Sequence, residues 1–78
     1  MTPVTARQAA ERLEREPCTI RQWAHRYKVR ALGRAGRETV YDYGDLATIE
    51  WCIWDGQEVP ATPEDRDELR AARRETAT

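Results

Sequence analysis

The sequence is poor in the residue types that build metal sites. It has two cysteines, one histidine and no phenylalanine among its 78 residues. Cys18 and Cys52 do not form a C-x-x-C pair, and together with His25 they give fewer than the roughly four ligands that a structural zinc ion takes. We therefore expect no metal site, no cofactor and two reduced cysteines.

Long hydrophobic runs are also missing. No stretch approaches the roughly 18 apolar residues that a membrane span needs. The N-terminus lacks the basic region and apolar stretch of a secretory signal. Arginine outnumbers lysine twelve to one, which favours a GC-rich bacterial genome. We expect a cytoplasmic bacterial protein that does not contact a membrane.

The sequence does not carry the groupings that enzymes use. It contains no Ser-His-Asp set, no phosphate-binding glycine loop and no pair of carboxylates for a pocket that 78 residues could build. Cys18 and His25 are roughly 10 Å apart along a helix, which is too far for a nucleophile and its base. The length allows a single domain with a modest core. We expect no enzymatic activity.

The net charge of -1 hides an uneven distribution. Residues 1–41 carry a balance of +5, and residues 42–78 carry a balance of -6. A basic half followed by an acidic half is typical of a polyanion-binding face joined to an acidic segment. A balanced total therefore does not exclude a nucleic-acid partner.

Two helices are predicted in the basic half. Thr5 and Gln8 form a capping box, so a helix should begin near Ala6. Pro17 suits the first position of a second helix, which leaves residues 14–16 as a short turn. The second helix has an inward stripe at i, i+3, i+4 and i+7, made of Ile20, Trp23, Ala24 and Tyr27. Its outward side chains can all take part in polar contacts: Cys18, Thr19, Arg21, Gln22, His25 and Arg26.

A hairpin and a third helix are predicted next. Two strand-like runs, residues 30–32 and 39–41, flank a loop with two glycines and two arginines. Asp42 or Asp45 should then cap a helix that ends at Asp55-Gly56. The predicted inward residues of this helix are Leu46, Ile49 and Ile53, and Trp51 and Trp54 are expected to close the core.

The remaining residues are predicted to form a weakly structured tail. Residues 57–63 suit a linker, and residues 63–75 could form a helix with an acidic start and a basic end. Leu69 is the only large apolar residue of that segment, so the helix should have almost nothing with which to dock. We therefore divide the chain into a domain at residues 1–56 and a tail at residues 57–78.

Several of these stretches resemble a known family. They are residues 4–13 with the paired alanines, residues 17–24 with Thr-Ile-x-x-Trp, Arg37 to Tyr41, and Asp45-Leu46. Over about residues 3–54 the sequence resembles the winged helix-turn-helix DNA-binding domain of the MerR superfamily, and among its branches the small phage and plasmid excisionases and stand-alone regulators. The family often has Gly-Val in the turn, where this chain has Glu14-Arg15-Glu16. The segment after Trp54 is too short and polar for the coiled coil and effector domain of MerR regulators.

The predicted fold class is thus mainly α with a small β-hairpin, in a winged helix-turn-helix arrangement. The expected function is sequence-specific binding of double-stranded DNA, as an excisionase (a recombination directionality factor) or a small transcriptional regulator. The resemblance implies an integrase or recombinase as a partner, head-to-tail self-association on repeated sites, and DNA bending. Two alternatives are a protein-interaction adaptor or inhibitor from a phage or mobile element, and a DNA-recognition protein like a terminase small subunit.

The predicted DNA-binding residues fall into three groups. Base contacts are assigned to the second helix, with Arg21 suited to guanine and Gln22 to adenine, supported by Thr19, His25 and Arg26. The wing, which is the predicted hairpin, contributes Arg34 and Arg37. Contacts to the DNA backbone are assigned to Arg7, Lys28 and Arg30. Five phosphate contacts would give a log-log salt slope of about -4.5.

Overall fold

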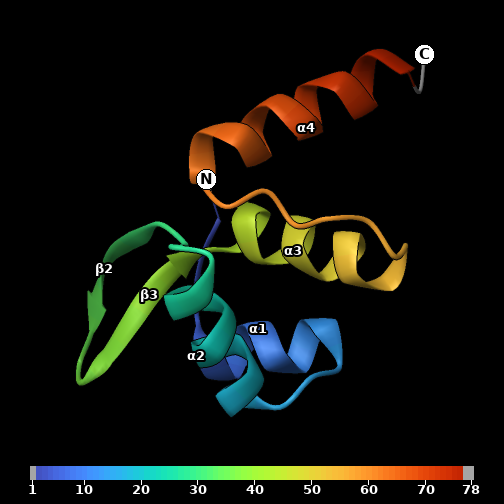
Figure 1. The fold of residues 1–78 in the computed structure, drawn as a ribbon. Coiled ribbons are helices and arrows are strands. Elements are labelled where there is room, and N and C mark those ends of the chain that lie inside the picture. The colour runs from blue at the N-terminus through green and yellow to red at the C-terminus, as the bar shows by residue number, and fades with distance from the viewer. Residues whose placement is uncertain (1, 77–78) are drawn as a thin grey trace.

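The structure is a computed structural model that describes residues 2–76 (Figure 1). These residues form four helices and a three-stranded antiparallel sheet, so the fold mixes α and β elements. In chain order the elements are β1 (Pro3–Thr5), α1 (Ala6–Leu13), α2 (Pro17–Arg26), β2 (Ala31–Ala35), β3 (Glu38–Asp42), α3 (Tyr43–Trp54) and α4 (Pro63–Thr76).

The sheet has the order β1-β3-β2, and both pairings are antiparallel. The predicted hairpin is present as β2 and β3. The strand β1 was not predicted. It pairs with β3 on the side opposite β2, with Val4 next to Tyr41. As a result the sheet is wider than the hairpin alone and is tied to the start of α1.

The beginning of α1 follows the predicted capping box. The backbone N–H of Gln8 donates to the Thr5 hydroxyl at 3.2 Å, and the backbone N–H of Thr5 donates to the Gln8 side-chain oxygen at 2.9 Å. These two bonds satisfy donors that a helix N-terminus otherwise leaves free. The helix ends at Glu14, whose φ of 55° is left-handed, and α2 begins at Pro17 as expected.

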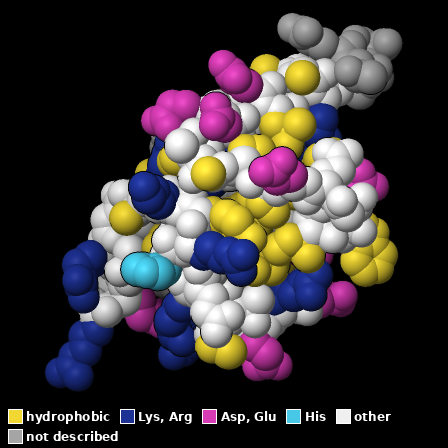
Figure 2. Space-filling model, viewed as in Figure 1, with side chains coloured by type: hydrophobic (Ala, Val, Ile, Leu, Met, Phe, Trp, Pro, Cys, Tyr) yellow, Lys and Arg dark blue, Asp and Glu magenta, His cyan; other side chains and the backbone are white. Residues whose placement is uncertain are grey.

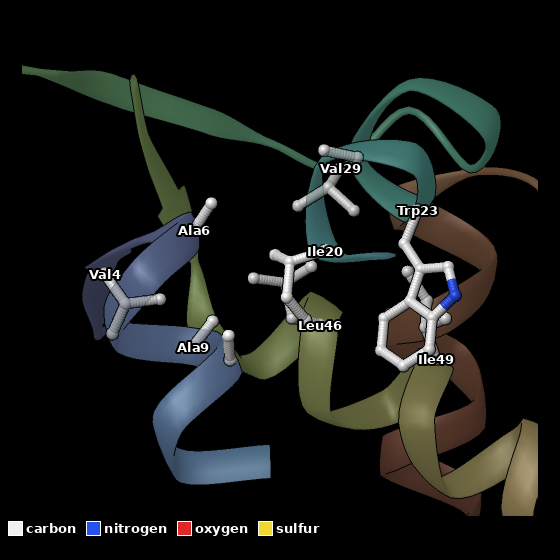
Figure 3. Close-up of a cluster of buried hydrophobic side chains, with 10 residues drawn as sticks. Val4, Ala6, Ala9, Ile20, Trp23, Val29, Leu46 and Ile49 are labelled. Atoms are coloured by element: carbon white, nitrogen blue, oxygen red, sulfur yellow. The ribbon is translucent and has the colours of Figure 1, made fainter. Parts of the chain in front are cut away.

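The hydrophobic core lies where α1, α2, α3 and the sheet meet (Figure 3). Ile20 and Leu46 occupy its centre, with Trp23 and Ile49 on one side and Val4, Ala6 and Ala9 on the other. The alanines of α1 let α2 and α3 approach it closely, because they add little side-chain volume. The inward stripe of α2 is confirmed for Ile20, Trp23 and Ala24, whereas Tyr27 ends the helix and is half-buried.

The cap of α3 is Asp42, whose carboxylate accepts the backbone N–H of Gly44 at 3.2 Å. The predicted inward stripe is correct for Leu46 and Ile49 and wrong for Ile53, which is 40% exposed. Cys52 is buried in its place. The prediction that Trp54 closes the core is also wrong, since 80% of this residue is exposed.

The helix α4 lies against α3, on the side opposite the α1–α2 pair (Figure 1). The expectation that this segment has almost nothing with which to dock is wrong. Arg66 is the largest fully buried side chain of the described residues, and it reaches into the body of the protein. The guanidinium of Arg73 stacks on Trp51, 3.6 Å from the ring centroid. The docking is polar and cationic, and apolar periodicity gives no signal for a contact of this kind.

Candidate nucleic-acid interface

The outer face of α2 presents polar side chains to solvent. Arg21, Gln22, His25 and Arg26 are exposed, while Thr19 is half-buried. They lie outward because Ile20, Trp23 and Ala24 hold the opposite side of the helix in the core. Figure 2 shows Lys, Arg and His side chains gathered on the side that holds α2 and the hairpin, while several Asp and Glu side chains lie over α4.

The β2–β3 hairpin carries two more exposed arginines next to its turn. Arg34 and Arg37 flank Gly36, whose φ of 64° allows the tight reversal between the strands. The Arg34 guanidinium donates to the backbone carbonyl of Arg37 at 3.2 Å. The hairpin thus holds two cationic side chains clear of the core.

A hollow of about 220 Å³ connects the helix with the hairpin. Arg21 of α2 and Arg37 of the hairpin both line it, together with Ala6, Glu38, Thr39 and Tyr41. Arg7 lies at this side too, with 77% of its side chain exposed and its guanidinium 3.6 Å from the Glu38 carboxylate. An exposed pair at this distance leaves Arg7 able to exchange Glu38 for another anion.

The end of α2 adds a cation in an uncommon backbone conformation. Lys28 is exposed and has a φ of 51°, which turns the chain from the helix toward the hairpin. Next to it, the Arg26 guanidinium lies 5.6 Å from the centroid of the Tyr27 ring. Arg26 thus lies in the last turn of α2, and Lys28 extends the cationic surface beyond it.

Arg30, predicted to contact the DNA backbone, is paired with carboxylates of the protein. Its guanidinium donates two hydrogen bonds to the Asp67 carboxylate, at 2.6 and 3.0 Å, and lies 3.8 Å from both Asp42 and Asp45. The hydrogen bonds to Asp67 are the main reason that the pKa of Arg30 is raised and that of Asp67 lowered. Arg30 therefore differs from the other predicted DNA-binding residues, because its charge is compensated within the protein by Asp67.

The prediction gave Arg66 no role and considered Asp45 as an alternative cap of α3, whereas the two side chains bond each other and Arg66 also bonds the end of α2. Asp45 is fully buried and shares the inward face of α3 with Thr48, Ile49 and Cys52, at the spacing i, i+3, i+4 and i+7. A carboxylate on a buried helical face requires a cationic or hydrogen-bonding partner. That spacing was visible in the sequence and could have indicated a buried partner, although not which residue supplies it.

A second hollow, of about 350 Å³, lies between α4 and the start of α3. Its charged lining residues are Arg30, Asp42, Asp67 and Arg70. Arg70 also hydrogen-bonds Asp67 and donates to the Thr48 hydroxyl at 3.3 Å. Since these charges pair with one another, this hollow offers less attraction to an ion than the face formed by α2 and the hairpin.

The two thiols are in different environments. Cys18 is exposed at the start of α2, whereas Cys52 is buried and desolvation raises its pKa. Over residues 2–76, no group of three His, Cys, Asp or Glu side chains is placed to hold a metal ion. None of the helices in that range combines the length and apolar character required to cross a membrane.

Comparison with known proteins adds no assignment. No family model, no curated protein and no solved structure matches this chain.

Proposed function

We propose that this protein binds double-stranded DNA in a sequence-specific way, as a winged helix-turn-helix protein that acts as an excisionase or a small transcriptional regulator. The observation that supports this most is the joint placement of Arg21 on α2 and Arg37 on the hairpin around one hollow. A helix of this kind fits the major groove of B-DNA, and a hairpin beside it can reach the adjacent backbone or minor groove.

In this proposal the outer face of α2 reads the bases. Arg21 donates two hydrogen bonds to a guanine, and Gln22 pairs with an adenine through its amide. Thr19 contacts a thymine methyl group or a phosphate, and His25 and Arg26 extend the contact along the groove. The wing arginines Arg34 and Arg37, together with Arg7 and Lys28, bind phosphates and fix the orientation of the helix.

The test begins with selection of a binding sequence from a random duplex library, followed by affinity measurements on the selected and a random duplex. Arg21→Ala should lose about 1 to 3 kcal/mol on the selected duplex and relax the preference at one base pair. Arg34→Ala should weaken both duplexes alike, because a phosphate contact carries no sequence information. Equal losses on both duplexes for the two variants would contradict the division of roles.

The salt dependence tests how many cations face DNA. With Arg30 held by Asp67, four candidates for phosphate contacts are left, namely Arg7, Lys28, Arg34 and Arg37. Four contacts give a log-log slope of about -3.6, or roughly a 150-fold loss of affinity between 50 and 200 mM salt. A slope near zero on the selected duplex would sink the proposal.

The exposed Trp54 favours a second candidate, a protein-interaction adaptor. A large aromatic residue that is 80% exposed, next to the half-exposed Ile53, is the type of surface that protein partners cover. The acidic Asp55 and Glu58 are close by in the sequence and would suit a basic partner. The discriminating measurement is a gel shift with random duplex at low salt, where a complete absence of binding favours the adaptor.

A further inference from the structure

The side chain of Arg66 extends from the polar helix α4 into the body of the protein. Its side chain is 0% exposed, so it cannot touch a DNA molecule bound at the surface. Burying a guanidinium is costly unless hydrogen bonds and an opposite charge compensate it. Two of the groups that provide this compensation, the carbonyls of Tyr27 and Lys28, lie at the end of α2, and the opposite charge comes from Asp45 of α3.

The first partners are at the end of α2. The Arg66 guanidinium donates to the backbone carbonyls of Tyr27 at 2.7 Å and Lys28 at 3.3 Å, and also to that of Pro60 at 3.1 Å. A helix leaves its last carbonyls without intrahelical partners, and a cation at this end interacts favourably with the helix dipole. Arg66 therefore caps α2 where the chain turns toward the hairpin.

The second partner is the buried carboxylate of Asp45 in α3, which accepts from Arg66 at 3.3 Å. The same carboxylate oxygen accepts the backbone N–H of Arg30 at 3.2 Å, immediately before β2. The Arg30 side chain in turn holds Asp67 of α4. This network of Arg66, Asp45, Arg30 and Asp67 joins the end of α2, the start of the hairpin, α3 and α4.

We propose that Arg66 is a positioning residue for DNA recognition, which sets the end of α2 relative to the hairpin without touching DNA. The inference rests on the proposed function, because it assumes that α2 and the hairpin contact one duplex together. Base contacts require side chains held to within a fraction of an ångström, whereas phosphate contacts tolerate more freedom. Loss of Arg66 should therefore reduce sequence preference more than general DNA affinity.

The first test compares Arg66→Met with Arg73→Met, which removes the same charge from the same helix but only a stacking contact with Trp51. Arg66→Met should lower affinity for the selected duplex about 10-fold and leave the random duplex within about 2-fold. Its salt slope should stay unchanged, because no phosphate contact is lost. Arg66→Lys should recover part of the preference, and Arg73→Met should retain all of it.

The second test does not require DNA. The Val29 amide donates to the Ala24 carbonyl and the Arg30 amide donates to Asp45, so both report on the junction of α2 and the hairpin. Amide hydrogen exchange at these two residues should accelerate about 10-fold in Arg66→Met relative to the amides of α1. If the wild type binds no DNA, the proposed function fails while this measurement still tests the positioning role.

With Arg66→Met, two results would overturn the inference: equal losses on both duplexes, or unchanged exchange at Val29 and Arg30. If Arg66→Met does not fold by circular dichroism, Asp67→Asn takes its place, because the Asp67 side chain is 45% exposed and the substitution is better tolerated. Asp67→Asn removes the negative charge and one of the two acceptor oxygens that hold Arg30, so it weakens the link between α4 and Arg30 and should reduce the preference about 3-fold. An unchanged preference in that variant also rejects the inference.

Discussion

At the scale of single residues, the arginines differ in burial and in the groups that they contact. Arg66 is buried, Arg30 is paired with Asp67, and Arg21 is exposed on α2. Others stack on aromatic rings, as Arg12 does over Tyr43 at 5.3 Å. A planar guanidinium serves all these roles, because it forms bidentate pairs and also lies flat on a ring. The number of arginines therefore overstates the positive charge available to an anionic partner.

Two isoleucines of α3 differ in burial, so their replacement tests which of them contributes to the core. Ile49 is fully buried and Ile53 is 40% exposed, although both were predicted to lie inward. Ile49→Ala should lower the free energy of unfolding by about 2 to 5 kcal/mol, since it leaves a cavity. Ile53→Ala, the matched control on the same helix, should cost less than about 1 kcal/mol. Urea unfolding measures both, and equal costs would contradict the observed burial.

At the scale of elements, the turn between α1 and α2 has a conformation that its residues do not favour. Glu14 ends α1 with a φ of 55°, and the Arg15 amide donates to the Ala10 carbonyl at 2.9 Å. Glycine is the usual residue at such a position, because a Cβ atom is strained in the left-handed region. The turn is therefore formed at some expense of stability.

Glu14→Gly should relieve that strain. We expect a gain of up to about 1 kcal/mol in the free energy of unfolding, reduced by the greater freedom of glycine in the unfolded chain. Glu11→Gly is the control, since Glu11 is an exposed residue inside the same helix and its replacement should cost about 1 kcal/mol. Thermal unfolding of the two variants compares them, and a loss of stability in Glu14→Gly would refute the strain.

Elements with a local signal could be predicted from the sequence, and elements that depend on distant contacts could not. Thr5 and Gln8 indicate the start of α1, Pro17 that of α2, and both act within a few residues. The strand β1 is only three residues long and exists through its pairing with β3. The docking of α4 depends on Arg66, which donates to the carbonyls of Tyr27 and Lys28, 39 and 38 residues away.

The candidate interface follows the same rule. The exposure of Arg21 and Gln22 follows from helical periodicity within α2, so it could be predicted. The pairing of Arg30 with Asp67 spans 37 residues and involves a helix expected to be marginal, so no local pattern indicated it. Distant polar contacts are what the sequence left undetermined.

At the scale of the whole molecule, α4 is an integral part of the fold. The proposed boundary at residue 56 separates Arg66 from Asp45 and from the carbonyls that it caps. The acidic half of the chain also neutralises a cation of the basic half, through Asp67 and Arg30. The charge asymmetry is thus partly an internal contact and only partly a surface property.

The stability of this arrangement should depend on acid. Asp67 faces Arg30 and Arg70, and the carboxylates of Asp42 and Asp45 also lie near Arg30. The pKa of Asp67 is lowered, mainly because Asp67 accepts a hydrogen bond from Arg30. A carboxyl group whose pKa is lower in the folded than in the unfolded protein makes its full contribution to stability above the unfolded pKa of about 4. This contribution is lost as the pH falls through the pKa of the folded protein. Its side chain is 45% exposed, so solvent screening keeps the effect small.

Urea unfolding of the wild type and Asp67→Asn measures this contribution. The wild type should have the larger free energy of unfolding at pH 7. The difference between the two proteins should shrink at a pH well below about 4, the unfolded pKa of aspartate, because Asp67 is then protonated in both the folded and the unfolded state. Asp65→Asn, which replaces an exposed aspartate of the same helix, is the control. A difference that does not change with pH would exclude the ion pair as its origin.

The position of Arg66 after α2 and the hairpin in the chain also bears on how the protein is made. Synthesis proceeds from the N-terminus, so α2 and the hairpin leave the ribosome before the residue that caps them. Until Arg66 follows, the carbonyls of Tyr27 and Lys28 and the carboxylate of Asp45 lack their shared partner. The surface proposed to read DNA is therefore completed only when Arg66, 39 residues after Tyr27, has also been translated.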